Sequence, residues 1–376
     1  MPAEEARGGN RRRETKKLEV TEANVATLSE VMDEEAADPG TRHSLEYDEA
    51  ADPGTRHPLE YDEVAVPLLL KPVSWVAFGV GAALVPVKVV LIAVLGLFGV
   101  VLSDLLPQRI AGGPLQVLFR CAMACFGVLP GCLSVDDRRT ADDRADPAPI
   151  VILAPHCGML EGFFACYYFW VRVIMMAPYA KIPVLRSLVK ANNSIVVKLK
   201  RHEASSPKVA PEDTDAPSPK KASSAAREAI LEHTRAFDPA KKSQACAILP
   251  EGTTHNGAAL LTFFTGAFSP GAPVQPVIVR YPHKYFDAAS FCGSLASHLL
   301  RQVVCLYVPM TVTVLPVYRP TDDERADPEL YASNVRKHMA KGLGVPLSHY
   351  GAKRLNEEYY AKQTPKRRPG GADDVR

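Results

Sequence analysis

One nearly uncharged stretch limits the possible folds of this chain more than any other feature. The segment from residue 72 to 103 contains 32 residues with a single charge, Lys88, and a proline, Pro86, near its middle. About 20 apolar residues suffice to cross a bilayer, so the segment is long for one span and short for two. It predicts a tilted single helix or a re-entrant helical hairpin whose Lys88 extends to the membrane surface. A buried helix pair in a soluble domain is the third interpretation.

The residues before this stretch have a different character. Residues 1–64 are polar and charged and contain a 14-residue tandem repeat, at 35–48 and again at 49–62 with one change. Two copies of so short a unit cannot stack into a core, so we expect a disordered tail. This first part lacks an apolar core, and we therefore predict no cleavable signal peptide.

A second apolar stretch follows at residues 114–135. It carries Gln116 and Arg120, which favours a position at a membrane interface over a full span. We therefore expect residues 65–135 as a whole to form a hydrophobic region that anchors the chain to a membrane.

Strand-like and helix-like segments alternate from residue 136 to residue 350. This alternation predicts an α/β fold, a mixed sheet flanked by helices. Lys200 to Lys221, rich in Pro, Ser, Ala and charge, predicts a flexible insertion, and residues 351–376 predict a polar tail. The expected strands are 150–154, 173–177, 194–199, 245–249, 274–279 and 307–317. The expected helices are 159–172, 182–191, 223–237, 288–304 and 328–343.

Composition excludes some classes of function. The 376 residues carry a formal net charge of +2, which does not favour a nucleic-acid partner. Eight cysteines occur without a Cys-x2-Cys pair, and four of them lie inside apolar runs. Such cysteines indicate reduced, buried thiols rather than a disulfide framework. Those four are Cys121, Cys125, Cys166 and Cys246.

The first candidate site follows the expected strand 150–154. Pro155 ends that strand, and His156 stands on the turn before the next helix, with Glu161 five positions later. Inside one ideal helix this spacing would place the two side chains about 140° apart. On a turn, however, the carboxylate can fold back and orient the imidazole, as a general base requires. A buried histidine that merely satisfies its hydrogen bonds is the alternative.

The second candidate site follows the strand 245–249, in the sequence Pro250-Glu251-Gly252-Thr253-Thr254. Such a turn presents a carboxylate, backbone amides that glycine leaves accessible, and two hydroxyls. These groups suit recognition of a polyol or a phosphate. A plain turn is the alternative when this tetrapeptide is considered without the histidine element upstream.

Taken together, the His156-x4-Glu161 and Pro250-Glu-Gly-Thr253 elements resemble the two main sequence blocks of the glycerolipid acyltransferase family. The resemblance is greater to its lysophosphatidylcholine acyltransferase branch. The stretches that carry it are Thr262-Phe-Phe-Thr-Gly-Ala-Phe268, Val274-Gln-Pro-Val-Ile-Val-Arg-Tyr-Pro282 and Leu315-Pro-Val-Tyr-Arg-Pro320. It extends over roughly residues 70–355, with the first quarter matched only in hydrophobic character.

The resemblance implies a lysophospholipid acyltransferase that uses acyl-CoA and needs no metal or other cofactor. It implies His156 as general base, Glu161 as the group that sets its tautomer, and Glu251, Gly252 and Thr253 as the acceptor site. Thr254, Asn256 and Gly266 complete the candidate substrate-binding residues. A membrane location, in the endoplasmic reticulum with a cytosolic catalytic domain, follows from the same resemblance.

Four positions depart from the family pattern, and they leave an alternative open. Glu161 stands where Asp is usual, Arg186 and Asn193 stand in the second block, and Phe264 replaces a lysine. Phe264 predicts altered or weakened phosphate recognition. The alternative function is therefore a catalytically impaired, acyltransferase-like membrane protein that binds lipid or acyl-CoA.

Overall fold

The computed structural model describes residues 71–176, 186, 189, 192, 194–197, 219–241, 243–282 and 295–355. The predicted N-terminal tail with its tandem repeat therefore lies outside the described residues. So do most of the predicted insertion 200–221 and most of the predicted helix 182–191.

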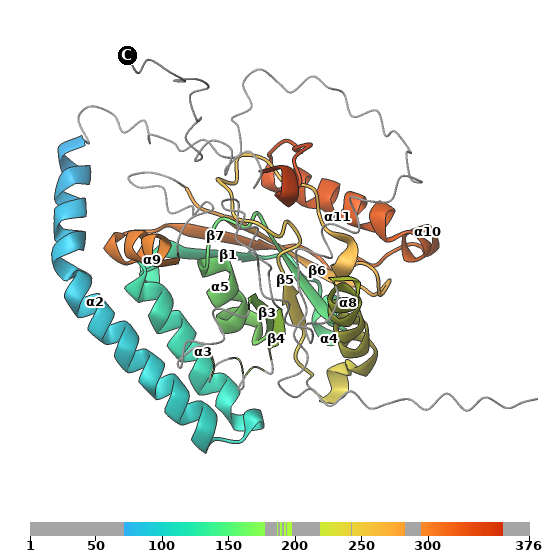
Figure 1. Ribbon diagram of the computed structural model, residues 1–376, viewed down its shortest axis with the longest axis horizontal. Helices are drawn as coiled ribbons and strands as arrows, with labels where there is room; N and C mark the ends of the chain where they lie inside the picture. Colours follow the sequence, from blue (N-terminus) through green and yellow to red (C-terminus); the bar gives the residue numbers. More distant parts are fainter. Residues whose placement is uncertain are drawn as a thin grey trace, which may run out of the picture.

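A seven-stranded mixed sheet forms the centre of the molecule, in the order β1-β7-β6-β2-β5-β3-β4 (Figure 1). All strand pairs are parallel except β6 and β7, which are antiparallel. The strands are β1 (Leu133–Asp137), β2 (Ile150–Ala154), β3 (Arg172–Met176), β4 (Ile195–Val197), β5 (Cys246–Ile248), β6 (Val274–Arg280) and β7 (Met310–Val314). This architecture is the mixed α/β fold that the sequence predicted.

Helices cover both faces of the sheet, and the alternation of side chains along β2 explains the two layers. Val151 and Leu153 belong to a core shared with α3, α5 and α9, whereas Ile150 and Ile152 belong to a core shared with α8 and α11. The helices are α2 (Lys71–Leu105), α3 (Gln108–Cys125), α4 (Ala141–Ala145), α5 (Leu160–Phe169), α8 (Pro219–Ala236), α9 (Leu295–Val304), α10 (Asp322–Ala326) and α11 (Pro328–Leu343).

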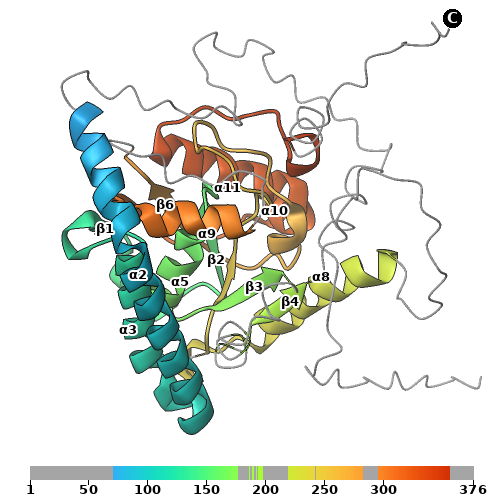
Figure 2. The same cartoon turned by 60° about the vertical axis from the view of Figure 1, so that its left-hand side comes forward.

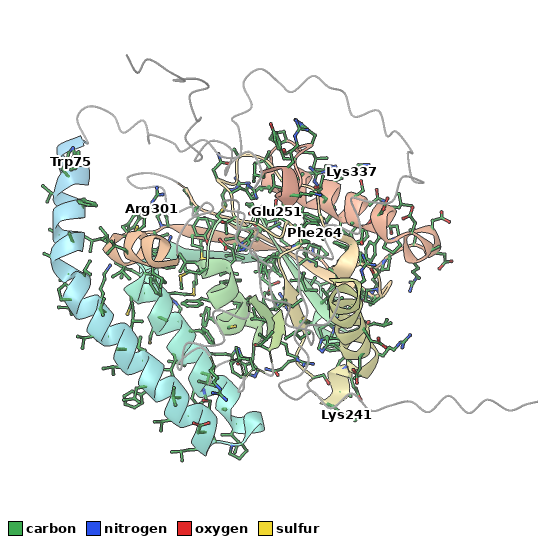
Figure 3. The ribbon with its side chains drawn as sticks, viewed as in Figure 1. Trp75, Lys241, Glu251, Phe264, Arg301 and Lys337 are labelled. Carbon is green, nitrogen blue, oxygen red and sulfur yellow. The ribbon has the colours of Figure 1, made fainter. Side chains whose placement is uncertain are left out.

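The apolar run forms one continuous helix, α2, with Pro86 inside it. This is the single-helix arrangement rather than a re-entrant hairpin within residues 72–103. Over residues 75–105, α2 is long and apolar enough to cross a membrane by length and composition. It lies along the edge of the molecule beside α3 (Figure 2). Most of its large apolar side chains are exposed. Trp75, at its outer end, is 72% exposed (Figure 3).

Lys88, the one charge in the apolar run, does not extend to a surface as predicted for the hairpin. Its Nζ donates to the carbonyl oxygens of Val303 at 2.9 Å and Cys305 at 2.6 Å. These carbonyls lie at the C-terminus of α9, where backbone oxygens lack helical partners and the helix dipole favours a cation. Two turns away, Gly81 lets α2 approach this end closely, because a Cβ at Gly81 would collide with the carbonyl of Val304.

We expect Lys88→Met to lower the free energy of unfolding by about 2 kcal/mol, since a charged donor to two carbonyls is lost. Thermal unfolding in detergent would measure this change, with Lys341→Met, at an exposed position on α11, as the matched control. Equal stability of the two variants would show that Lys88 does not hold α2 on the domain.

The polar residues of α3 also bond to backbone carbonyls of the protein. Gln116 Nε2 donates to the carbonyl of Tyr167 at 2.8 Å, and Arg120 Nη1 donates to that of Val128 at 2.8 Å. Leu115 and Met123 on the same helix are fully buried. Helix α3 thus packs between α2 and α5, and because Val117 on it is 61% exposed, its position at a membrane interface stays a prediction.

Several element boundaries differ from the sequence prediction. The predicted helix 159–172 ends at Phe169, and Arg172 already belongs to β3. Helix α8 begins at Pro219 rather than after Ser223. Residues 133–137, which are not among the expected strands, form the edge strand β1, where alternate side chains are exposed. Ala352 and Leu355 are fully buried, so the packed domain includes the first residues of the predicted tail.

Candidate active site

Strands β2, β5 and β6 are parallel neighbours, and the segments that follow them meet at one edge of the sheet. His156 follows β2, Glu251 follows β5, and Tyr281 follows β6. Parallel strands present their C-terminal ends on the same side, so residues far apart in sequence become neighbours there. The sheet therefore brings the two sequence motifs together, because each motif follows one of the predicted strands.

His156 and Glu161 form the contact that the sequence predicted. Nδ1 of His156 lies 3.3 Å from Oε2 of Glu161, which also accepts the N–H of Gly158 at 2.9 Å. The His156 side chain is 23% exposed, whereas Glu161 is fully buried in the first turn of α5. A carboxylate is favourable at this helix N-terminus. If Nδ1–H donates to the carboxylate, Nε2 carries the lone pair that can accept a proton.

Glu251 is fully buried, and it supports the backbone around His156. Oε2 accepts the N–H of His156 at 2.7 Å, and Oε1 accepts the N–H of Leu261 at 2.8 Å. Burial acts to raise the pKa of Glu251, but nearby His255 and these backbone donors outweigh it, so the pKa lies below its ordinary value. Glu251 therefore remains a carboxylate and holds the catalytic turn against the loop that follows β5.

His255, which the sequence analysis did not single out, completes this support. Its backbone N–H donates to the carbonyl of His156 at 3.0 Å. Its ring is fully buried, with Nδ1 accepting the N–H of Gly257 at 3.2 Å and Nε2 lying 3.0 Å from Oε1 of Glu251. The only sequence signal was its position four residues after Glu251, which does not distinguish it from a surface histidine.

The loop containing His255 packs closely on the His156 turn. Gly257 has a φ of 74°, and a Cβ at this position would lie 3.0 Å from Sγ of Cys157. Only glycine accommodates both the backbone conformation and this approach. Cys157 is buried beneath the loop, consistent with a packing role rather than the role of a nucleophile.

Phe264 lies beside the turn that contains Glu251 (Figure 3). Gly252 has a φ of 65°, and a Cβ there would collide with the Phe264 ring. The N–H of Phe264 donates to the carbonyl of Pro250 at 2.8 Å, which fixes the ring beside the turn. An aromatic ring thus borders the predicted acceptor turn. Thr253 is buried there and Thr254 is half-buried.

Two further predicted substrate-binding residues, Asn256 and Gly266, lie in the segment after Glu251. Oδ1 of Asn256 accepts the N–H of Ala258 at 3.0 Å, which forms a tight turn in the loop after Glu251. Gly266 lies in a short 3-10 turn, Thr265–Ala267, which packs against α8 and α11 on the face of the sheet opposite α5. Open space surrounds the position of a Cβ at Gly266, so no close approach requires a glycine there.

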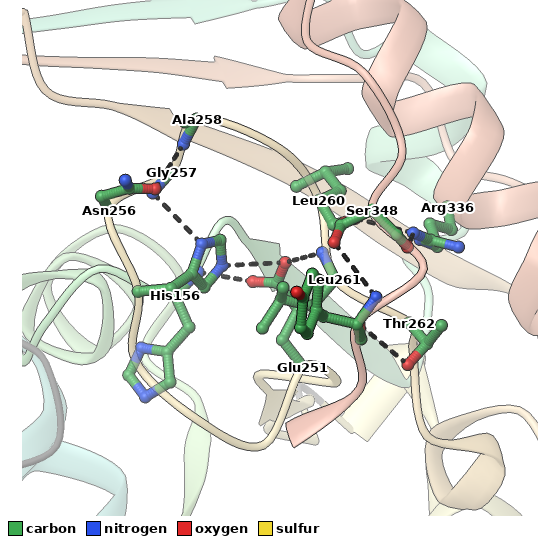
Figure 4. A network of polar contacts seen from close by, with 12 residues as sticks. His156, Glu251, Asn256, Gly257, Ala258, Leu260, Leu261, Thr262, Arg336 and Ser348 are labelled. Atoms are coloured by element: carbon green, nitrogen blue, oxygen red, sulfur yellow. Dashed lines mark hydrogen bonds and ion pairs between the residues drawn. The ribbon is translucent and has the colours of Figure 1, made fainter. Parts of the chain in front are cut away.

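Arg336 on α11, another residue that the sequence analysis did not single out, connects the loop to the C-terminal segment (Figure 4). Its guanidinium donates to the carbonyl of Leu260 at 2.7 Å and to that of Ser348. The segment after α11 also pairs with the loop through a bridge between Leu347 and Leu260. The residues after α11 therefore help to hold the loop that ends at Leu261, the second backbone partner of Glu251.

The remaining departures from the family pattern are only partly visible. Arg186 is exposed. Asn193 lies outside the described residues. So do Lys190 and Lys198, two nearby cations that could bind a phosphate in its place.

Comparison with known proteins is consistent with this geometry. The chain is 31% identical over 262 residues to a lysophosphatidylcholine acyltransferase of Drosophila melanogaster, covering 69% of this chain and 45% of that protein. It is 32% identical over 206 residues to lysophosphatidylcholine acyltransferase 1 of Danio rerio, covering 54% of this chain and 35% of that protein. With the human protein of the same name it is 46% identical over 106 residues, or 27% and 20% of the two chains. The chain thus spans less than half the length of these relatives.

Two other comparisons add little. No protein-family profile matches the chain. Among solved structures, the 1-acyl-sn-glycerophosphate acyltransferase PlsC of Thermotoga maritima covers 73% of this chain and 98% of its own, with 15% identity and a TM-score of 0.43. That similarity is too distant to support a conclusion. The sequence relatives, together with the paired motifs, show that the chain belongs to the glycerolipid acyltransferase family, in its lysophosphatidylcholine acyltransferase-like branch.

Proposed function

We propose that this chain is an acyl-CoA-dependent lysophospholipid acyltransferase that transfers a fatty acyl group to the free hydroxyl of a lysophospholipid. The observation that carries the proposal is the contact between partly exposed His156 and buried Glu161 at the sheet edge. The curated relatives are named for lysophosphatidylcholine, and this acceptor class is carried over from them as part of the proposal.

The proposed reaction needs one base and a good leaving group. Nε2 of His156 takes the proton of the acceptor hydroxyl, and the oxygen attacks the thioester carbonyl carbon. The carbon–sulfur bond then breaks, and the thiolate of coenzyme A receives the proton from His156. Glu161 holds the ring in the tautomer that leaves Nε2 unprotonated and stabilises the imidazolium that forms. We propose that this step uses no metal or other cofactor.

The acceptor site is proposed to include the turn at Gly252, Thr253 and Thr254, beside the base. Glu251 also has a structural role beside the acceptor role implied by the resemblance. Its two oxygens accept the backbone N–H groups of His156 and Leu261, so it shapes the turn that presents the acceptor site. Asn256 likewise contributes to loop structure.

We also propose that the exposed apolar side of α2 binds a bilayer, where the chains of both substrates reside. Trp75, Phe78 and Leu97 are among its exposed large residues, at 72%, 48% and 62%. Exposed apolar area of this extent is typical of a membrane or partner surface. An endoplasmic reticulum location with a cytosolic catalytic domain is part of the same proposal. No contact of the described residues favours a binding protein without turnover.

The test measures release of coenzyme A thiol from acyl-CoA by membranes containing the full chain, with a panel of lysophospholipids. Release that depends on the lysophospholipid, and that stops when His156 is replaced, would support the proposal and identify the acceptor. No release from a folded, membrane-bound protein would instead favour the lipid-binding alternative.

Phe264 gives a prediction about specificity. Because an apolar ring covers Gly252 where an ammonium would attract a phosphate, we expect Phe264→Lys to lower KM for lysophosphatidic acid about 3- to 10-fold, a change of about 1 kcal/mol. Phe264→Met, which keeps an apolar side chain, is the matched control. An unchanged KM in the lysine variant would show that this ring does not adjoin the acceptor phosphate.

A further inference from the structure

Tyr281 is placed at the candidate active site by the register of the central strands. Ala154 at the end of β2 pairs with Ile278 of β6, and the strands run parallel. His156 lies two residues beyond Ala154, and Tyr281 lies three residues beyond Ile278. The two side chains therefore leave neighbouring strands at the same edge, on either side of the carboxylate of Glu161.

The buried carboxylate of Glu161 has separate partners for its two oxygens. Oε2 faces His156 and Gly158, as described above, and Oε1 accepts the hydroxyl of Tyr281 at 2.5 Å. This distance is typical of a strong hydrogen bond from a hydroxyl to an ionised acceptor. Tyr281 is only 8% exposed and Glu161 is 0% exposed. Without the Tyr281 hydroxyl, Oε1 would lose this hydrogen bond and remain a buried, charged atom.

The hydroxyl is well suited to act only as a donor here. Burial, and next the negative charge of Glu161, raise the pKa of Tyr281 well above its ordinary value. The phenol therefore keeps its proton and donates a hydrogen bond to Oε1. Glu161 is one methylene longer than the aspartate usual at this position, and its carboxylate reaches from His156 on one side to Tyr281 on the other.

We propose that Tyr281 is a positioning residue for the proposed acyl transfer, which sets the orientation and basicity of Glu161 and, through Glu161, of His156. The inference rests on the proposed function, because it assigns Tyr281 a part in the same base. The hydroxyl withdraws charge from the carboxylate and fixes its rotation. Tyr281 has no proposed contact with either substrate.

Loss of the hydroxyl has a predictable direction. A carboxylate with one donor fewer binds a proton more readily and also holds a proton on His156 more tightly. Both effects inactivate the base at the acidic side of the activity profile. We therefore expect Tyr281→Phe to lower kcat/KM about tenfold and to move the acidic limb of its pH profile upward by about half a pH unit or more.

The matched control is Tyr318→Phe, which removes another tyrosine–glutamate hydrogen bond away from the site. Tyr318 Oη donates to Oε1 of Glu324 at 2.7 Å, near the start of α10. We expect this variant to leave the pH profile of kcat/KM unchanged. A pH profile of Tyr281→Phe that coincides with that of the control would overturn the proposal, whatever the loss of stability.

A second variant tests the geometry of the Glu161 side chain. Glu161→Asp shortens the side chain, so one carboxylate can no longer satisfy both His156 and Tyr281. In a double-mutant cycle, the activity lost through Glu161→Asp should be smaller in the Tyr281→Phe background than in the wild type. Independent, multiplicative losses would contradict the coupling.

A readout without substrate separates this inference from the proposed function. Diethyl pyrocarbonate modifies neutral imidazole, and His156 is partly exposed. Mass spectrometry of His156 modification against pH should give a midpoint that is higher in Tyr281→Phe than in the wild type and in Tyr318→Phe. If the wild type has no transferase activity but this midpoint moves, the proposed function fails and the coupling stands. An unmoved midpoint overturns the coupling even in an active enzyme.

Discussion

Replacement of His156 by alanine is expected to lower kcat/KM for lysophospholipid acylation about 10²- to 10⁴-fold, the usual contribution of a general base. The physical reason is that no other described group is placed by Glu161 to take the proton of the acceptor hydroxyl. The fold should change little, because the structural contacts of His156 are made by its backbone, through the carboxylate of Glu251 and the N–H of His255. Thiol release with saturating acyl-CoA would measure the loss.

The control for this experiment is His338→Ala. His338 is an exposed histidine on α11, away from the sheet edge. We expect it to retain full activity, and both variants to unfold at the temperature of the wild type within a few degrees. Undiminished acyl transfer by His156→Ala would remove His156 from the role of base and, with it, the mechanism proposed above.

The second large effect is expected at Glu251. Glu251→Ala removes the acceptor of two buried backbone donors, on His156 and Leu261, and leaves buried His255 without its carboxylate. Each buried donor left without an acceptor costs about 1–3 kcal/mol of folding free energy. Activity should fall as well, because the turn that carries His156 loses its connection to the loop after β5. Denaturant unfolding of the detergent-solubilised protein would measure the stability.

Glu251→Gln separates structural support from substrate binding. The amide keeps the shape of the side chain, but it has one oxygen for two backbone donors, so we expect an intermediate loss of stability. Glu329→Gln, at an exposed position on α11, is the matched control. If Glu251→Gln were as stable as the control and raised only the KM for the lysophospholipid, direct contact with the acceptor would be the better interpretation.

Regular, locally encoded elements were predictable from the sequence. Helix α11 begins and ends at the predicted residues, because Asp327 caps its start and Gly344, with a φ of 70°, ends it. Strand β2 is an unbroken apolar run and also has its predicted bounds. Strand β1 was missed because its exposed alternate residues, Ser134 and Asp136, are polar and it is followed by a charged run, and only pairing with β7 makes it a strand.

At the candidate site, the sequence alone was enough to find His156 and Glu161, because both belong to one short motif on a strand-to-helix turn. That the two motifs are neighbours depended on the parallel pairing of β2 with β5, which local sequence does not encode. The roles of Glu251, His255 and Tyr281 depended on tertiary structure. Each side chain acts through atoms from distant segments, and neither the direction of a buried side chain nor its hydrogen-bond partner is encoded in local spacing.

The same distinction holds for the apolar run. Its length and lack of charge were enough, without a structure, to predict that residues 72–103 form an unusually long apolar element. Whether Lys88 would reach a membrane surface or a protein partner was decided only by packing. A cation in an apolar helix is stabilised by whichever oxygen atoms lie within reach, and the fold places the C-terminus of α9 beside it.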